Sequence, residues 1–364
     1  MSARFAVLGA GLMGRLLAFT LAREGHAVEV YERGGADGGT SAAHVAAAML
    51  APLAESVEAE KLIVDLGLAS LERWPELLAS LPAPVFFQRS GTVIVWHSQD
   101  RDQAAQFGRR LHRLDDGLPP ENRARELTGA EIAELEPGLG QRFPRGIYLP
   151  REGQLDNRAL LTALGLALTE SGVTPHWHGE SSPEHVQADW IVDCRGLGAK
   201  PDWQALRGVR GEVVRVHAPE VNLTRPVRLL HPRYPLYIAP KPDGVYVIGA
   251  TQIESEDLSP TSVRSALELL SALYSVHPAF GEARILEMAT QCRPALPDNK
   301  PEIRWAGGKL IQINGLYRHG YLIAPAVLEA AMALIQRLTH STEGLDDWRN
   351  RQLWAPLYHL KETA

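Results

Sequence analysis

The chain has 364 residues, of which 45% are hydrophobic and 22% are charged, and its formal net charge at pH 7 is −6. These values are ordinary for a soluble enzyme with room for two domains, and the acidic balance argues against nucleic acid as a partner. The two cysteines, Cys194 and Cys292, lie far apart without paired spacing, which favours a reducing, cytoplasmic compartment over a disulfide framework. No uninterrupted apolar run reaches the roughly 18 residues that a membrane span needs, so we predict none.

The N-terminal region is predicted to form a dinucleotide-binding unit. Its apolar pattern indicates a strand at 5–8, a helix at 13–23 and a second strand at 27–31. Between the first strand and the helix stand the glycines of a G-x-G-x-x-G turn, Gly9, Gly11 and Gly14. The first permits the tight turn, the second lets the backbone approach a pyrophosphate, and the third lets the helix pack closely on its strand.

Glu32 ends the second predicted strand, at the distance from the glycines where a carboxylate binds a ribose diol. This carboxylate would repel a 2′-phosphate, so NADP is disfavoured. The alternative is that the glycines form only a tight structural turn.

The remaining elements follow in chain order. A Gly/Ser/Ala-rich segment at 38–52 precedes a helical pattern at 58–81. A strand-like pattern at 86–97 and a charged stretch with several prolines at 109–137, typical of a surface helix and loop, come next. A helix at 157–171 and a short strand at 189–194 follow, and the latter is expected to join the N-terminal sheet. Further strands are predicted at 212–217, 227–230, 236–239 and 245–248, then a helix at 262–274, a strand at 309–314, a loop at 315–320 and a helix at 326–338.

This order indicates an α/β protein whose first domain is interrupted twice. We predict a nucleotide-binding domain in three parts, 1–84, 149–210 and 291–364, and a second domain with an antiparallel sheet in two parts, 85–148 and 211–290.

Several separated motifs resemble those of the flavin-dependent D-amino acid oxidase superfamily, and within it the small bacterial glycine oxidases associated with thiamine biosynthesis. The segments TSAA at 40–43 and AAMLAP at 47–52 are similar to the flavin-contacting segment of these enzymes. YIAPK at 237–241 and VIGATQ at 247–252 resemble their substrate-domain strands. CRPALPD at 292–298 resembles their Arg-Pro motif, and YRHGYLIAP at 317–325 their C-terminal flavin loop.

The resemblance implies a discontinuous Rossmann-like FAD-binding domain and an antiparallel-sheet substrate domain. FAD is expected to be non-covalent, because no histidine or cysteine stands in a recognisable flavinylation context. The residues expected to contact it are Gly9, Gly11, Leu12, Met13, Gly14, Glu32, Arg33, Thr40, Ser41, Ala48, Met49, Leu50, Gly196, Gly198, His319, Gly320, Tyr321 and Leu322.

Ala48 departs from the family pattern, because a glycine is usual at this position. The extra methyl group is tolerable only if the backbone φ there is below zero. We therefore expect a negative φ at Ala48.

Four residues are expected to act on the substrate. An amino acid carries a carboxylate into a partly dry pocket, where a planar guanidinium is the natural partner, and by resemblance that partner is Arg293. Tyr237 would donate its hydroxyl to the same carboxylate. Arg318 would shape the site or bond a carbonyl of a helix or loop, and Gln252 would line the pocket or simply end a strand. The structural alternatives are that Arg293 forms a surface or interdomain salt bridge and that Tyr237 is a half-buried aromatic residue of an antiparallel sheet.

No metal site is predicted. His176, His178 and His185 lie in a polar stretch without the further ligands of a preformed site, so a solvated loop is favoured.

The implied activity is FAD-dependent oxidative deamination of glycine or a small D- or N-methyl amino acid, with oxygen as the second substrate. The products are the 2-oxo acid, ammonia or an amine, and hydrogen peroxide, and a role in supplying thiamine thiazole synthesis is open. The alternative is a D-amino acid dehydrogenase that passes electrons to a quinone or another carrier. Two further interpretations are an enzyme that modifies macromolecule-bound carboxymethylamines and a non-enzymatic flavin-binding scaffold. A homo-oligomer is left open.

Overall fold

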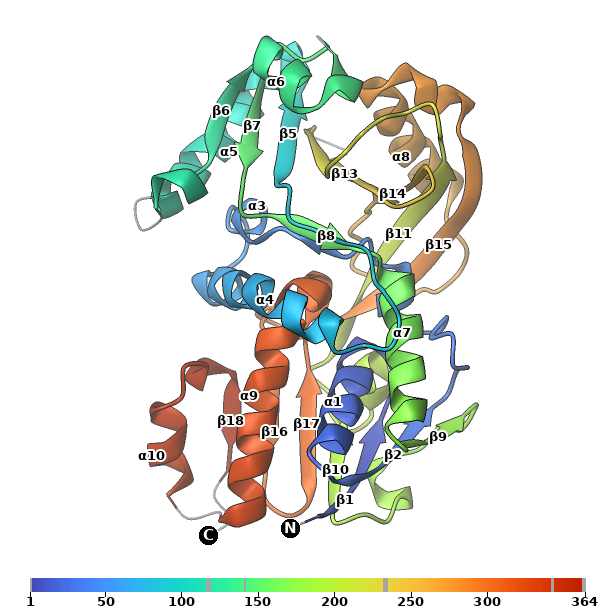
Figure 1. Ribbon diagram of the computed structural model, residues 1–364, viewed down its shortest axis with the longest axis vertical. Coiled ribbons are helices and arrows are strands. Elements are labelled where there is room, and N and C mark those ends of the chain that lie inside the picture. The colour runs from blue at the N-terminus through green and yellow to red at the C-terminus, as the bar shows by residue number, and fades with distance from the viewer. Residues whose placement is uncertain (1, 116–118, 141, 232–234, 342–343, 362–364) are drawn as a thin grey trace.

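The structure is a computed structural model that describes residues 2–115, 119–140, 142–231, 235–341 and 344–361. Two large sheets lie at opposite ends of the elongated molecule (Figure 1). Helix α4 (Lys61–Ala79) lies between them, whereas helix α7 (Asn157–Glu170) runs beside the first sheet, next to its N-terminal part. The predicted α/β class, with one mainly parallel and one mainly antiparallel sheet, is confirmed.

The first sheet has seven strands and contains the N-terminal unit. In spatial order its strands are β18 (Tyr358–Leu360), β16 (Glu302–Trp305), β17 (Leu310–Asn314), β10 (Trp190–Asp193), β1 (Arg4–Leu8), β2 (Ala27–Glu32) and β9 (Thr174–Trp177). Neighbouring strands are parallel except for the antiparallel pair β16 and β17. The expectation that the strand at 189–194 joins β1 is correct, since Phe5 pairs with Trp190.

Helices α1 (Leu12–Arg23) and α9 (Gly320–His340) pack with α4 and α7 into the main apolar core of this unit. α9 begins earlier than predicted and contains Pro325. A proline inside a helix leaves the carbonyl four residues earlier without its partner. Here that carbonyl, on Tyr321, accepts the indole N–H of Trp74 at 3.1 Å, and the amide of Ala326 donates to Ser70 Oγ at 3.1 Å. α4 thus supplies the partners that allow α9 to continue through its proline.

The segment Tyr317–His340 is long and apolar enough to cross a membrane, although 72% of its most apolar window is buried inside the protein. Such burial is typical of a core helix.

The second sheet has eight strands and is antiparallel apart from the pair β12 and β5. In spatial order its strands are β15 (Arg284–Ala295), β11 (Arg207–His217), β14 (Val245–Gly249), β13 (Leu236–Pro240), β12 (Val227–Leu230), β5 (Thr92–Trp96), β7 (Arg145–Leu149) and β6 (Arg125–Thr128). One face packs on an apolar cluster that includes residues of α8 (Val263–Val276) and α6 (Gly129–Leu135). Residues of α5 (Arg101–Asp115) join a cluster with Ile94 and Leu230.

β11 and β15 run through the predicted boundaries at 210/211 and 290/291, so both strands pass between the units without a break. The division of the chain into five segments stays a prediction.

A small sheet, β3 (Met49–Leu50), β8 (Gly153–Leu155) and β4 (Phe87–Gln88), lies between the two large ones. It is flanked in the sequence by two short helices, α2 (Ala42–Val45) and α3 (Pro52–Glu55).

Several strands have no counterpart among the sequence predictions, namely β3, β6, β7, β8, β9, β15, β16 and β18. β9 shows why. The polar stretch around His176 was expected to be a solvated loop, yet His176 lies in a strand, stacks on Tyr31 and bonds Glu29 at 2.9 Å. An edge strand of this kind has little apolar periodicity, so only its pairing with β2 reveals it.

Candidate active site

A large cavity of about 1010 Å³ extends between the first sheet and the second. This volume is at the upper end of the roughly 300–1,000 Å³ usual for small-molecule sites. It brings together segments from both ends of the chain, including 20 of the 22 residues singled out from the sequence as site residues. The lining residues are Gly9, Gly11, Leu12, Met13, Glu32, Arg33, Thr40, Ser41, Ala48, Met49, Gly196, Gly198, Tyr237, Gln252, Arg293, Arg318, His319, Gly320, Tyr321 and Leu322.

Gly14 and Leu50 were expected to contact the cofactor and do not line the cavity. A Cβ at Gly14 would overlap the carbonyl oxygen of Gly9, so this glycine serves the close packing of α1 on the turn. Leu50 is fully buried in the main core, because it follows Met49 along β3 and successive side chains of a strand point to opposite faces. The side chain of Leu50 therefore points away from the cavity, and its expected cofactor contact stays a prediction.

The glycine turn has the geometry that its sequence demands. Gly9 has a φ of +88°, and a Cβ there would approach the carbonyl oxygen of Cys194 to 2.8 Å. Only glycine fits both the conformation and the space. The backbone at the end of β1 therefore lies directly against the end of β10, at the carboxyl edge of the parallel sheet, where open α/β sheets bind ligands.

Glu32 organises the same corner. Its carboxylate accepts the amide of Ala10 at 2.6 Å and the amide of Gly34 at 2.9 Å, and the hydroxyl of Thr40 lies 3.3 Å away. Glu32 lines the cavity although only 8% of the residue is exposed. Because each carboxylate oxygen accepts more than one hydrogen bond, the side chain can hold the turn and still accept from a diol.

The segment that contains Ala48 differs from the expectation. Ala48 has a φ of +52°, in the left-handed region, and is almost fully buried. The predicted negative φ is wrong. The neighbouring backbone explains why an alanine is held there: the carbonyl of Ala48 accepts the amide of Leu155 at 3.2 Å, and the carbonyl of Ala47 accepts Lys241 Nζ at 2.9 Å. Tertiary hydrogen bonds on both sides thus fix a conformation that costs an alanine roughly 1–2 kcal/mol.

Lys241 is a buried cation that ties three segments together. Its ammonium also donates to the carbonyl of Leu155 at 2.7 Å and to Gln154 Oε1 at 3.1 Å, so all three protons have acceptors. Burial lowers the pKa of Lys241 to about 7. The lysine links the β13–β14 hairpin of the second sheet to β8 and to the segment before Ala48.

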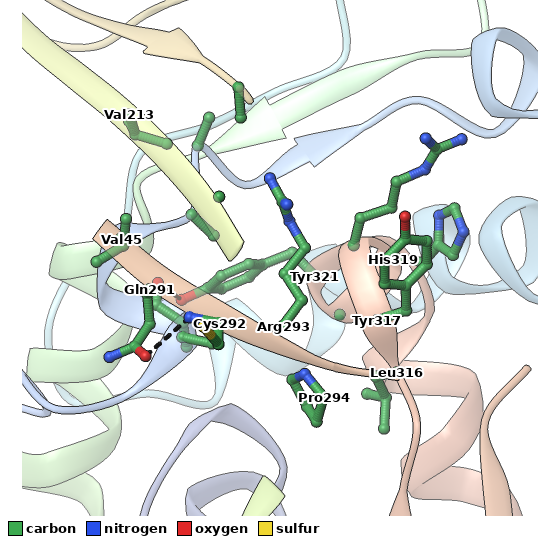
Figure 2. A pocket seen from close by; sticks show the side chains of 18 of the residues that line it. Val45, Val213, Gln291, Cys292, Arg293, Pro294, Leu316, Tyr317, His319 and Tyr321 are labelled. Atoms are coloured by element: carbon green, nitrogen blue, oxygen red, sulfur yellow. Dashed lines mark hydrogen bonds between the residues drawn. The ribbon is translucent and has the colours of Figure 1, made fainter. Parts of the chain in front are cut away.

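Arg293 extends from β15 into the cavity, on the side where Tyr317 and His319 lie (Figure 2). Both terminal nitrogens donate to the carbonyl of Thr251 at 3.2 Å. Gly211 makes room for it, since a Cβ there would fall on the guanidinium. Within the described part of the chain no carboxylate lies within 4.0 Å of Arg293, which leaves the predicted salt-bridge alternative without a partner.

Tyr237 lies on β13, and its phenol oxygen sits above Gly249, where a Cβ would meet it. Burial raises the pKa of Tyr237, while the nearby cations Arg293 and Arg228 oppose that shift. The phenol therefore keeps its proton at neutral pH and remains a hydrogen-bond donor.

Arg318, in contrast to Arg293, has carboxylate partners. Its Nε lies 2.9 Å from Glu55 Oε2, and its Nη2 donates to Glu58 Oε2 at 2.7 Å. The remaining Nη1 donates to Gln252 Oε1 at 3.1 Å, so Gln252 positions this arginine. Two carboxylates thus hold Arg318, rather than the helix or loop carbonyl of the alternative interpretation.

Glu55 also pairs with Arg228 of β12, whose Nη2 donates to Glu55 Oε1 at 3.0 Å. Burial alone would raise the pKa of Glu55, but Arg318 and Arg228 lower it to about 2. Burial lowers the pKa of the adjacent His319 to about 4, so this imidazole is neutral at pH 7. Close by, burial raises the pKa of Glu152 to about 7, although its carboxylate accepts the amide of Ala54 at 2.6 Å.

Glu55, Arg228 and Glu152 were not singled out from the sequence. A charged residue directly after the apolar run at 47–54, and an arginine inside a predicted strand at 227–230, were signals for the first two. Their pairing joins α3 to β12 across nearly half the chain and could not be inferred from either signal.

No group of three or more His, Cys, Asp or Glu side chains capable of holding a metal ion occurs among the described residues. Cys194 lines the cavity, and burial raises the pKa of its thiol well above the usual range, so it stays protonated.

The cavity fits FAD in two respects. At one end the tight glycine turn and Glu32 offer the contacts of a dinucleotide site, and at the other an apolar wall with Val45, Val213 and Met49 approaches Arg293 and Tyr237. Gly9, Gly11 and Glu32 would hold the dinucleotide part of FAD, and FAD would supply redox chemistry to a substrate bound in this cavity.

The chain resembles known proteins over most of its length. The family model described as FAD dependent oxidoreductase (DAO) matches residues 4–333. The chain is 41% identical over 326 residues to a Rhizobium etli protein named as a thiamine biosynthesis oxidoreductase, ThiO, covering 89% of this chain and 94% of that protein. It is 26% identical over 361 residues to the glycine oxidase of Geobacillus kaustophilus, covering 91% of this chain and 92% of that protein.

Two solved structures have the same fold. The glycine oxidase from Geobacillus kaustophilus superposes with a TM-score of 0.78 at 24% identity, and the iminodiacetate oxidase from Chelativorans sp. BNC1 with a TM-score of 0.77 at 21% identity. Each superposition covers 92% of this chain and 95% of the other.

Proposed function

The chain belongs to the DAO family of FAD dependent oxidoreductases, and from this premise we propose that it oxidises glycine or another small amino acid with oxygen. The overall reaction converts the amino acid, water and oxygen into the 2-oxo acid, ammonia and hydrogen peroxide. For an N-methyl substrate, methylamine leaves in place of ammonia. The observation that carries the proposal is Arg293, a guanidinium at the cavity wall that no carboxylate of the described residues neutralises.

The charge at Arg293 selects the substrate class. A buried or half-buried cation without a counter-ion is costly, so it attracts an anionic ligand. A carboxylate has two oxygens in one plane, which match two parallel N–H groups of a guanidinium. The carbonyl of Thr251 holds the guanidinium in place before the ligand arrives.

Tyr237 supplies the second contact in this proposal. Because burial raises its pKa, the phenol donates a hydrogen bond to the same carboxylate at neutral pH. Two fixed donors define the orientation of the carboxylate, and with it the direction of the Cα–H bond.

When bound, FAD supplies the two-electron oxidation chemistry. The chain's own part is to bind the substrate, to fix its orientation and to keep water from the apolar wall near Val213. No described side chain near Tyr237 needs to act as a base, since His319 faces Glu55 and Arg318 faces two carboxylates.

Supply of the thiazole part of thiamine is proposed from the relative named ThiO, and oxygen as acceptor from the relative named glycine oxidase. These names support an oxidase over the dehydrogenase alternative. A cytoplasmic location and a homo-oligomer stay predictions.

The test is an anaerobic titration of the purified flavoprotein with glycine, sarcosine and both enantiomers of alanine and proline. Loss of the oxidised flavin absorbance with at least one of them, followed by its return with oxygen and release of peroxide, is expected. No bleaching by any amino acid would overturn the proposal. Bleaching without return in oxygen would instead favour the dehydrogenase.

Two further measurements test the cofactor site. Acid precipitation should release all flavin into the supernatant if FAD is non-covalent. Hydrogen exchange should show protection on FAD addition at 9–32, 189–198 and 315–322 together, and protection confined to the first segment would contradict the discontinuous site.

A further inference from the structure

The charged side chains around Tyr237 form a continuous arc along the cavity wall. Arg293 donates to the carbonyl of Thr251, and the next residue, Gln252, accepts from Arg318. Arg318 then meets Glu55 and Glu58, and Glu55 meets Arg228. We call Arg293, Arg318, Arg228, Glu55 and Glu58 the arginine arc.

The arc has three guanidiniums and two carboxylates, and so carries one net positive charge. His319 adds none at pH 7, because burial lowers its pKa to about 4. The surplus charge is located at Arg293, since Arg318 and Arg228 both have carboxylate partners. One substrate carboxylate therefore completes the charge balance of the wall.

Glu55 decides this balance. It is the shared partner of two arginines, with one carboxylate oxygen for each, and its side chain is only 13% exposed. Glu58 contacts Arg318 alone, and its side chain is 65% exposed, so solvent screens its charge. Removal of the charge on Glu55 would leave the positive charges of Arg228 and Arg318 largely unneutralised beside Arg293. Removal of the charge on Glu58 would change the net charge felt in the cavity little.

We infer that Glu55 is a specificity-determining residue that restricts the pocket to amino acids with a single carboxylate. The inference rests on the proposed function, in which Arg293 binds that carboxylate. A second carboxylate on the substrate would approach arginines that are already neutralised and would meet the negative charge of Glu55. Discrimination against a substrate with two carboxylates thus has two sources. Glu55 repels the second carboxylate, and no further arginine of the arc lacks a carboxylate partner.

Kinetics with glycine, sarcosine and iminodiacetate test the inference in four proteins: the wild type, Glu55→Gln, Glu55→Asp and Glu58→Gln. Sarcosine controls for substitution on nitrogen without charge. In Glu55→Gln the ratio of kcat/KM for iminodiacetate to that for sarcosine should rise by roughly ten- to a hundredfold. Glu55→Asp keeps the charge and should stay near the wild-type ratio, and Glu58→Gln should change the ratio by less than about threefold.

An equal loss of activity toward sarcosine and iminodiacetate in Glu55→Gln would overturn the inference, because a purely structural role lowers both. The double variant Glu55→Gln/Arg228→Gln locates the effect, since it should lose most of the gained preference for iminodiacetate.

A ligand titration keeps the inference falsifiable if Glu55→Gln does not fold or if no amino acid is oxidised. Acetate and malonate are added to the wild-type holoenzyme, and their dissociation constants are read from the flavin spectrum. Malonate should bind no more tightly than acetate, and malonate binding tighter by tenfold or more would refute the role of Glu55. Failure of every amino acid as substrate, with acetate still preferred over malonate, would count against the proposed function alone.

Discussion

The two sides of the cavity wall use arginine in opposite ways. On the β15 side, Arg293 is held by a backbone carbonyl and has no carboxylate partner among the described residues. On the α3 side, Arg318 is held by Glu55 and Glu58. Both arginines lie in motifs that resemble the same family, so the motif alone does not show which of them is available to a ligand. The counter-ions decide that, and they come from distant parts of the chain.

The largest expected effect concerns the unpaired arginine. Arg293→Ala should lower kcat/KM for the best amino acid by about two to four decades, because a charged hydrogen-bond partner in a desolvated pocket is worth roughly 3–5 kcal/mol. Arg293→Lys should recover part of the loss, since an ammonium keeps the charge without the planar fork. Steady-state kinetics of both variants measure the effect.

Arg318→Gln is the matched control for Arg293→Ala. It should lower the free energy of unfolding, because Glu55 loses one of its two arginines, whereas Arg293→Ala should leave stability and flavin content close to wild type. The assignment fails if Arg293→Ala loses as much activity on an amine without a carboxylate as on the amino acid.

The α3 side of the wall should show its buried acid in a pH profile. The folded-state pKa of Glu152 is about 7, above its ordinary value near 4.5, so the folded chain holds this proton more tightly than the unfolded chain. The resulting stability is present below the unfolded pKa and is lost as the pH rises from about 4.5 to 7. Glu152→Gln should remove this loss and be more stable than wild type at pH 8, by at most about 3 kcal/mol.

Urea unfolding at pH 5 and pH 8 measures the difference. A variant that is destabilised more at pH 8 than at pH 5 would show that Glu152 is a charged, well-paired carboxylate. Glu55 contributes with the opposite sign, since its pKa is lowered to about 2 and its stabilisation is lost only as the pH falls below about 4.5.

Tyr237→Phe sharpens the comparison on the Arg293 side. The phenol is a neutral donor beside a cationic one, so its removal should weaken transition-state binding by only about 1–2 kcal/mol. This loss corresponds to a roughly tenfold lower kcat/KM. The same variant should leave oxidation of a carboxylate-free amine unchanged. A loss larger than that of Arg293→Ala would make Tyr237 the main determinant of substrate binding.

The smallest effect concerns the strained segment between the two units. Ala48→Gly relieves an alanine at a φ of +52°, which gains roughly 1–2 kcal/mol, but it adds entropy to the unfolded chain worth roughly 0.4–1 kcal/mol. A net stabilisation of at most about 1.6 kcal/mol is therefore expected in thermal or urea unfolding. The neighbouring Ala47→Gly, at a residue without positive φ, should destabilise instead. If both variants lose stability equally, the strain at Ala48 is negligible.

Much of the fold could be predicted from the sequence because its signals are local. The glycine turn, the strand before it and the helix after it stand within one short stretch, and the structure has them with nearly the expected bounds. The family, the fold class and FAD followed from several separate motifs, and the comparisons confirm them. The strands β9 and β18 escaped prediction, because edge strands carry little periodicity and are defined by their partners.

The sequence by itself determined which residue types are present at the cavity, since Arg293, Tyr237, Glu32 and the glycines stand in recognisable motifs. Only the tertiary structure decided how charge is distributed among them. Glu55 meets Arg228 and Arg318 across separations of more than 170 and 260 residues, and Lys241 meets the carbonyl of Ala47 across a separation of 194. Hydrophobic periodicity and turn chemistry act over a few residues, whereas the neutralisation of a buried charge depends on whatever side chain the fold brings near. That is why the resemblance could point to Arg293, but the carboxylate partners of Arg318 and Arg228 could not be predicted before the structure.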